Sequence, residues 1–229
     1  MTTSPIASEG AFVDLHLHST ASDGTDTPAE VVRTAHGAGL AALALTDHDT
    51  VDGIAEAQET ARSLGIRLVP GVELSVYEGT TEMHLLGLHL EDLDEMDRHL
   101  AVYRSARRTR AEEIVRRLND IGVRITMDDV LAAARDGAIG RPHVARALVE
   151  NGWAMDLRDA FARYLAEGRP GYLDKRRMSI EEALGLVHRC GGIVVYAHPG
   201  SDGTNERLAE LAARGLDGVE VLHPSHGAD

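Results

Sequence analysis

Short apolar runs that end in histidine or carboxylate residues recur through the first third of the chain. The runs and their polar residues are 12–17 with His16 and His18, 40–46 with Asp47 and His48, and 66–72 with Glu73. Helix patterns at residues 28–38 and 50–64 separate them. This alternation predicts an α/β fold with a parallel sheet or barrel. In such folds chemistry takes place at the carboxyl ends of the strands, where we expect these polar residues to gather.

The first of these runs reads D-L-H-L-H-S over residues 14–19. Polar and apolar residues alternate with the period of a strand, so His16 and His18 fall on one face. Two imidazoles on one face at the end of a strand can both reach a divalent cation. A half-buried strand that carries two polar residues by chance explains the stretch equally well when it is taken alone.

Composition narrows the class of protein. The chain has 229 residues, of which 43% are hydrophobic, but it has only two Phe and one Trp, so the predicted core is aliphatic. The formal net charge of −14 argues against a surface that coats DNA or RNA. This charge still allows an enzyme that takes a nucleotide into a metal-lined pocket.

The expected location is the cytoplasm. The single cysteine, Cys190, excludes an internal disulfide and suits a reducing compartment. The first ten residues are polar, so we expect no signal peptide. No apolar run approaches the ~20 residues that span a bilayer, so we expect no membrane partner.

The α/β pattern is interrupted after a fourth expected strand, residues 82–90, which contains His84. Residues 91–190 carry helix signals and little strand signal, which predicts an inserted helical subdomain. The pattern returns in 191–229, with expected strands at 192–197 and 217–222 that lead into His198 and His223. The predicted domains are therefore a barrel formed by 12–90 and 191–229 and a helical cap formed by 91–190.

Histidines and carboxylates accumulate at the expected strand ends. The set comprises His16, His18, Asp23, Asp47, His48, Glu73, His84, His198, His223 and His226. Any one of them, taken alone, is more readily explained as a structural histidine or a surface carboxylate. Nitrogen and oxygen donors without thiolate suit Zn, Mn or Fe in a hydrolytic site. A carboxylate such as Glu73 can bridge two ions, as two-metal sites require.

These motifs resemble the PHP superfamily, named for polymerase and histidinol phosphatase domains. The resemblance rests on D-L-H-L-H-S at 14–19, T-D-H-D at 46–49, G-V-E at 71–73 and A-H-P-G at 197–200, in that order. D-G at 23–24 and G-R-P-H at 140–143 are similar to the branch that hydrolyses nucleoside phosphates, including 3′,5′-nucleoside bisphosphates, and trims short RNA. The resemblance implies a distorted (β/α)7 barrel with a helical insertion and three divalent metal ions.

Carried over residue by residue, the resemblance assigns ligands. It implies His16, His18 and Glu73 for a first ion, Glu73, His84 and His198 for a second, and Asp23 and His48 for a third. It casts Asp14, Asp47 and Asp49 as residues that orient the imidazoles. His198 and His223 are the candidate catalytic residues, as proton donors, although a histidine bound to metal cannot serve in that way.

Arg141 and His143 are candidate substrate-binding residues, since an arginine fork and an imidazole suit a phosphate that is not being cleaved. The alternative is an ordinary first helical turn, in which Pro142 needs no function. The basic cluster at 175–177 could attract a nucleotide, but a solvated run of charge explains it more simply.

The predicted function is hydrolysis of phosphate esters in nucleotides or short RNA by a metal-dependent phosphoesterase. Histidinol phosphate or another small phosphate ester is the alternative substrate, and a non-catalytic PHP module is the other alternative. The family pattern continues to a last strand that ends in G-S-D-x-H, and the printed sequence stops at Asp229. We therefore expect a barrel that lacks its last strand, with the first and third ions each one ligand short. The sequence predicts no oligomeric state.

Overall fold

The computed structural model describes residues 12–134, 139–174 and 176–223. The chain divides into two compact units. One holds the chain up to Arg98 and again from Met178, and the other holds His99–Arg177. Among the described helices, none is long and apolar enough to cross a membrane.

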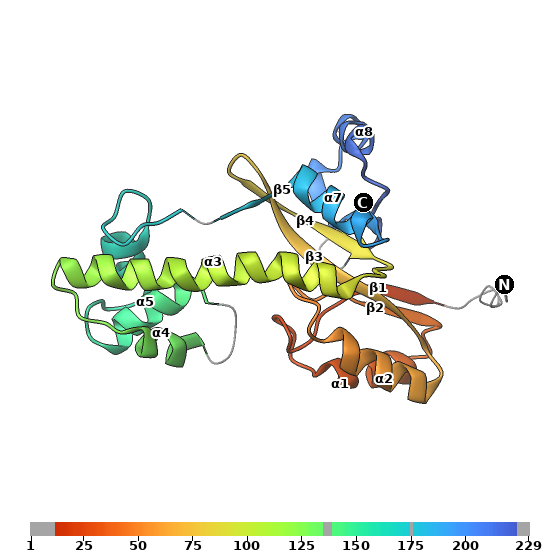
Figure 1. The fold of residues 1–229 in the computed structure, drawn as a ribbon, viewed down its shortest axis with the longest axis horizontal. Coiled ribbons are helices and arrows are strands. Elements are labelled where there is room, and N and C mark those ends of the chain that lie inside the picture. The colour runs from red at the N-terminus through yellow and green to blue at the C-terminus, as the bar shows by residue number, and fades with distance from the viewer. Residues whose placement is uncertain (1–11, 135–138, 175, 224–229) are drawn as a thin grey trace. The chain divides into compact units, whose positions relative to one another are not determined.

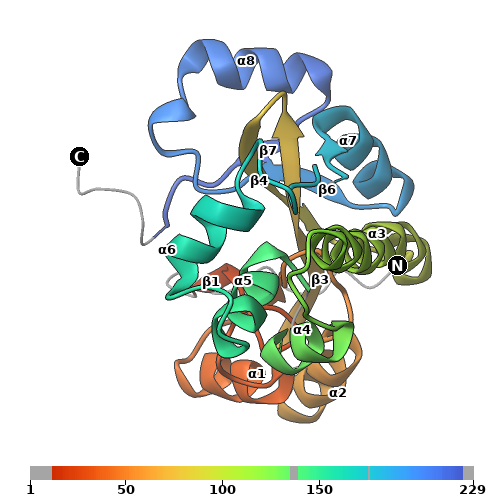
Figure 2. The ribbon, with the colours of Figure 1, turned by 90° about the vertical axis from the view of Figure 1, so that its left-hand side faces the viewer.

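A curled mixed sheet forms the centre of the first unit, with strand order β1-β2-β3-β4-β6-β7 and the short β5 paired with β3. The strands are β1 (Val13–Leu17), β2 (Ala42–Leu45), β3 (Arg67–Glu78), β4 (Thr81–Leu88), β5 (Met178–Ser179), β6 (Ile193–Tyr196) and β7 (Gly218–Val219). The helices α1 (Pro28–Gly37) and α2 (Ile54–Leu64) lie toward one end of the sheet. The helices α7 (Ile180–Arg189) and α8 (Asn205–Arg214) lie toward the other (Figures 1 and 2).

The expectation of a parallel sheet holds at both ends of the strand order and is wrong in the middle. β1, β2 and β3 are parallel, and so are β6 and β7, but β4 is antiparallel to both β3 and β6. The reason lies in the turn after β3. Glu78 pairs with Thr81, so two residues join the strands, and Gly79 takes the left-handed conformation (φ 60°). Glycine first in a two-residue loop favours a hairpin, whereas a parallel crossover needs a dozen residues or more.

The core beneath the sheet is aliphatic, as the composition predicted. Ala44, Val69, Leu86, Leu88 and Ala197 form one buried cluster.

The helix boundaries follow ordinary capping chemistry. The Thr27 hydroxyl and Glu30 form a capping box at α1. The Ser179 Oγ accepts the Glu182 N–H at 3.1 Å and so caps α7. Strand β5 was not predicted, because two residues are too short to show a period.

The second unit is built from helices. Its long helix α3 (Leu93–Asp120) begins in the first unit and is followed by α4 (Met127–Ala134), α5 (Arg141–Glu150), α6 (Leu157–Ala160) and a π-helical turn (Phe161–Leu165). Ile114, Leu118, Val144 and Leu148 lie in its buried apolar cluster. This unit therefore has a hydrophobic core of its own.

Candidate metal centre

One buried carboxylate, that of Glu73, organises the first unit. Its side chain is 1% exposed, and imidazole nitrogens from five histidines surround it. Oε2 lies 3.0 Å from His16 Nε2, 3.1 Å from His18 Nε2 and 3.4 Å from His48 Nε2, and Oε1 lies 2.8 Å from His84 Nδ1 and 3.0 Å from His198 Nε2. The structure thus brings together the predicted metal ligands that come from residues 16 to 198.

Strand pairing places Glu73 beside the end of β2. His48 and Glu73 form an isolated parallel bridge, the Glu73 N–H donates to the Asp47 carbonyl at 3.2 Å, and the Asp49 N–H donates to the Glu73 carbonyl at 2.9 Å. Glu73 itself lies in the middle of β3, so its expected place at a strand end was wrong. β3 continues beyond the end of β2 because it also forms the hairpin with β4.

The β3–β4 hairpin also positions His84. Glu73 pairs with Leu86, and His84 is two residues before Leu86 on β4. Residues two apart on a strand point to the same face, so the His84 ring returns to the Glu73 carboxylate. Its contact with His198, at 3.3 Å between Nδ1 and Nε2, joins the hairpin to the end of β6.

Charge in the centre is balanced around Glu73. Burial alone would raise the pKa of its carboxyl, but hydrogen bonds from His16, His18 and His84 hold that pKa far below its ordinary value. The pKa of His84 is raised, chiefly by its hydrogen bond to Glu73. Burial lowers the pKa of His48, and the nearby Glu73 charge only partly offsets this. Glu73 is therefore a buried anion. Positive charge, either from protonated imidazoles or from bound cations, stabilises it there.

Asp23 lies at the rim of the same centre. Its side chain is 69% exposed, and its carboxylate oxygens lie 3.5 Å from His18 Nδ1 and 3.8 Å from His48 Nε2. The loop that carries it is held against the backbone, since a Cβ at Gly24 would come within 2.7 Å of the His18 carbonyl. Only glycine fits this approach, which accounts for the Asp-Gly pair.

The carboxylate of Asp47 fixes the same loop. It accepts the Ser19 N–H, the Ser19 hydroxyl and the Ser22 hydroxyl, each at 2.7 Å. We expected Asp47 to orient an imidazole. In the structure it holds the loop between β1 and α1, because that loop brings two hydroxyls and a backbone N–H against it.

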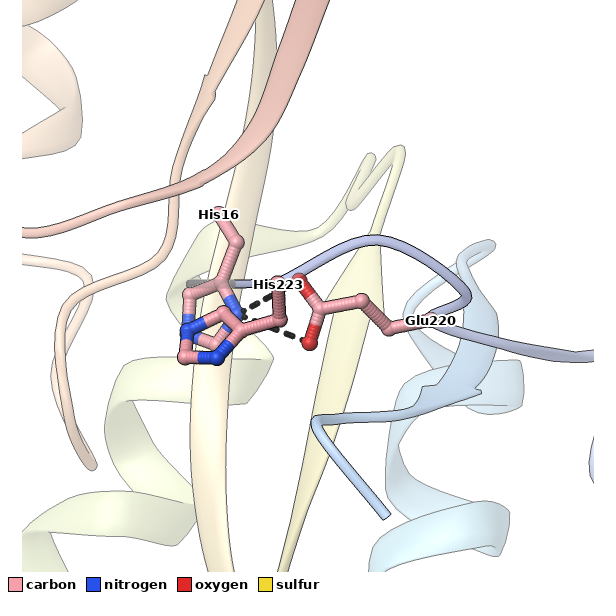
Figure 3. A group of neighbouring side chains, drawn as sticks. All are labelled: His16, Glu220 and His223. Carbon is pink, nitrogen blue, oxygen red and sulfur yellow. Dashed lines mark hydrogen bonds and ion pairs between the residues drawn. The ribbon is translucent and has the colours of Figure 1, made fainter. Parts of the chain in front are cut away.

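Glu220 is a site residue that the sequence reasoning missed. It follows β7 directly, and its side chain is 12% exposed. Its carboxylate faces His16 Nδ1, at 3.1 Å from Oε1 and 3.3 Å from Oε2 (Figure 3). Oε2 also accepts the His198 N–H at 2.7 Å. The signal was a second carboxylate inside the expected strand 217–222, which begins at Asp217 and which we extended past Glu220 to His223.

His198 has a strained backbone, with φ 31° in a residue other than glycine. Such conformations cost about 1–3 kcal/mol and persist where surrounding contacts impose them. Here the neighbouring Ala197 N–H donates to the His84 carbonyl at 3.1 Å, and the His198 N–H donates to Glu220. These two contacts hold the His198 ring against Glu73.

His223 completes the group of histidine rings. Its ring centroid lies 5.3 Å from that of His16 and 5.0 Å from that of His198, and Figure 3 shows it beside His16. The two candidate catalytic histidines, His198 and His223, are therefore neighbours. His226 and Asp229 lie outside the described residues.

Arg141 and His143 begin helix α5 in the second unit. His143 Nδ1 accepts the Gly140 N–H at 3.0 Å, and Arg141 Nη1 donates to the Leu165 carbonyl at 3.4 Å. The Arg141 guanidinium also lies 5.5 Å from the Tyr172 ring centroid. His143 thus has a structural role in capping the helix, and phosphate binding by this pair stays a prediction. In the basic cluster, Lys175 lies outside the described residues.

Comparison with known proteins decides the family. The PHP domain model matches residues 14–181, which contain Glu73 and the imidazoles of His16, His18, His48 and His84. The chain belongs to the PHP family. A 3′,5′-nucleoside bisphosphate phosphatase of Chromobacterium violaceum is 37% identical to this PHP chain over an alignment of 226 residues that covers 96% of the chain and 79% of that protein. The 5′-3′ exoribonuclease Rnm of Escherichia coli is 40% identical over an alignment of 216 residues that covers 91% of the chain and 74% of that protein.

Solved structures agree with this placement. A protein of Bifidobacterium adolescentis described as a metal-dependent phosphoesterase has a TM-score of 0.71 and 34% identity, and the match covers 96% of this PHP chain and 80% of that one. With these relatives, the PHP chain is a phosphoric ester hydrolase of the metal-dependent kind, as its motifs predicted.

Proposed function

We propose that this PHP protein releases phosphate from nucleotides, with 3′,5′-nucleoside bisphosphates and the 5′ ends of short RNA as substrates, at a centre of three divalent metal ions. The observation that carries the proposal is the buried Glu73 carboxylate with five imidazoles around it. Nitrogen and oxygen donors without thiolate suit Mn, Zn or Fe, so the donor set fits this chemistry.

The proposed ligand groups follow the distances. His16, His18 and Glu73 would hold one ion, Glu73, His84 and His198 a second, and Asp23 and His48 a third. Donor atoms within 4.8 Å of one another occur in the groups His16–His18–Glu73 and His18–Asp23–His48, which supports the first and third sets. The second set is supported by Glu73 Oε1, which lies 2.8 Å from His84 Nδ1 and 3.0 Å from His198 Nε2. When bound, the ions would lower the pKa of a water molecule toward ~7 and polarise the phosphate.

The remaining residues would position the substrate and move a proton. His223, whose ring neighbours that of His198, would protonate the leaving oxygen, since a metal-bound His198 cannot. Arg141 and His143 would hold the phosphate that is not cleaved. In this proposal the first unit is the distorted (β/α)7 barrel, and residues 91–190 are its inserted cap. The self-contained helical unit His99–Arg177 supports that division.

A substrate panel tests the function. Purified protein loaded with Mn, Zn or Fe is assayed with adenosine 3′,5′-bisphosphate, adenosine monophosphate, 5′-phosphorylated short RNA and histidinol phosphate, and bound metal is counted by elemental analysis. We expect release of phosphate or nucleotide from the first three, three ions per chain and inhibition by chelators. Exclusive turnover of histidinol phosphate would favour the alternative substrate. No turnover with one ion or none would indicate a non-catalytic module.

Replacing Arg141 with Ala tests the substrate-binding assignment. We expect KM for adenosine 3′,5′-bisphosphate to rise about tenfold, because a hydrogen bond to a charged group contributes about 1.5–3 kcal/mol. KM for adenosine monophosphate should change little, since it lacks the second phosphate. Arg158→Ala removes an exposed arginine of the same unit and serves as the control. Equal KM values for wild type and Arg141→Ala would show that Arg141 does not bind the substrate and has a structural role.

A further inference from the structure

A pocket of about 500 Å³ lies between the tip of the β3–β4 hairpin and the start of α8. Glu82 and Met83 line it from β4, Tyr196 and Pro199 from the end of β6, and Arg207 from α8. All of these residues belong to the first unit, so the pocket is formed within it. Its volume falls in the range of small-molecule sites, about 300–1,000 Å³.

The pocket opens onto the metal centre. His84 and His198 also line it, and these are the two histidines that contact Glu73 Oε1, at 2.8 and 3.0 Å. Glu82 is two residues from His84 on β4 and therefore shares its face. A substrate whose phosphorus atom lies beside Glu73 can thus extend one of its substituents into this space.

The charges of the pocket select which substituent fits. Glu78, Glu82 and Asp202 are acidic lining residues, and Arg207 is the basic one. The Arg207 guanidinium is bound by acidic partners. Nη2 donates to Glu78 at 2.7 Å, Nη1 donates to Glu210 at 3.0 Å, and Nε lies 3.7 Å from Asp202. The lining therefore holds three carboxylates against one guanidinium that is itself paired, which disfavours a second phosphate and favours an uncharged group that donates hydrogen bonds.

We propose that this pocket is the nucleobase subsite of the enzyme. The Pro199 ring supplies an apolar contact for a flat heterocycle, and the carboxylate of Glu82, on the face of β4 that carries His84, accepts from its exocyclic amine. This inference rests on the proposed function. It assigns the base of the nucleotide substrate to the acidic pocket beside the metal centre. The second phosphate of a bisphosphate must then bind cationic residues outside this pocket.

Inhibition by the two products tests the binding of the nucleoside and the binding of the phosphate separately. Adenosine and inorganic phosphate are used as separate inhibitors of adenosine monophosphate hydrolysis by the metal-loaded enzyme, and adenosine binding is also followed by NMR without turnover. Glu82→Gln keeps the shape of an exposed side chain and removes its charge. Glu59→Gln makes the same change on an exposed face of α2 and is the matched control.

We expect Glu82→Gln to weaken adenosine binding about tenfold and to leave phosphate inhibition unchanged, while Glu59→Gln affects neither. Ribose, which lacks the base, should bind more weakly than adenosine to the wild type. Adenosine that binds equally to wild type and Glu82→Gln, or that does not bind an enzyme active on nucleotides, would overturn the subsite. A protein that hydrolyses no nucleotide but still shows adenosine binding sensitive to Glu82→Gln would overturn the proposed function instead.

Discussion

Glu73→Gln is expected to lower kcat/KM for nucleotide hydrolysis by at least about 10³-fold. A bound metal ion supplies several kcal/mol of transition-state stabilisation, and each ~1.36 kcal/mol is tenfold in rate. The substitution keeps the volume of the side chain and removes the charge that His16, His18, His48, His84 and His198 surround. Because Glu73 is proposed to serve two ions, bound metal should fall from three ions per chain to one. Steady-state kinetics and elemental analysis measure the two effects.

Glu59→Gln, on the exposed face of α2, is the control for this substitution, and circular dichroism of both variants confirms that they fold. In the metal-free protein we expect the pKa of His84 to fall in Glu73→Gln, because its hydrogen bond to Glu73 is the main cause of its raised pKa. NMR titration of the histidines detects that change. Wild-type activity and three bound ions in Glu73→Gln would show that the carboxylate is not a ligand.

Glu220→Gln is expected to reduce metal affinity and kcat each by about 10–100-fold, the usual cost of losing a group that orients a metal-binding histidine. The Glu220 carboxylate accepts from two donors, His16 Nδ1 and the His198 N–H. An amide has one acceptor oxygen, and its NH₂ group would face the second donor. Either the His16 ring or the His198 backbone therefore loses its partner, and the proposed ligands of two ions are disturbed together.

Isothermal titration of metal-free protein with Mn²⁺ measures this loss without reference to turnover. Glu206→Gln, an exposed residue in the first turn of α8, is the matched control. Glu220→Asp keeps two acceptor oxygens on a shorter side chain and should recover part of the affinity. Affinity within twofold of wild type in Glu220→Gln would show that the two histidines are held without this carboxylate.

Local sequence patterns predicted the parts of the fold that depend on neighbouring residues. The strands that carry His16 and His84 and the helices found within residues 91–190 follow from period and composition. The motif order also grouped the five histidines that the structure places around Glu73. Period and composition depend on residues that are close in sequence, which is why the elements are visible there.

Pairing between distant segments was harder to predict. Glu73 was placed at a strand end because nothing in 66–72 shows that β3 continues into a hairpin with β4. Glu220 was missed because its partners His16 and His198 are remote, and its own segment shows only an apolar run. Asp47 was assigned to an imidazole because the two serines that it binds lie in a loop without periodicity.

The contact between His16 and Glu220 joins residues 204 positions apart. Loops of such length close late, since their entropy must be lost before the contact contributes any stability. When the nascent chain has been synthesised through His84, several of the donors that surround Glu73 are present. His198 and Glu220 have not yet been synthesised. During synthesis the nascent chain therefore holds an incomplete set of donors, and a hydrolase with this geometry becomes competent only when nearly the whole first unit has been made.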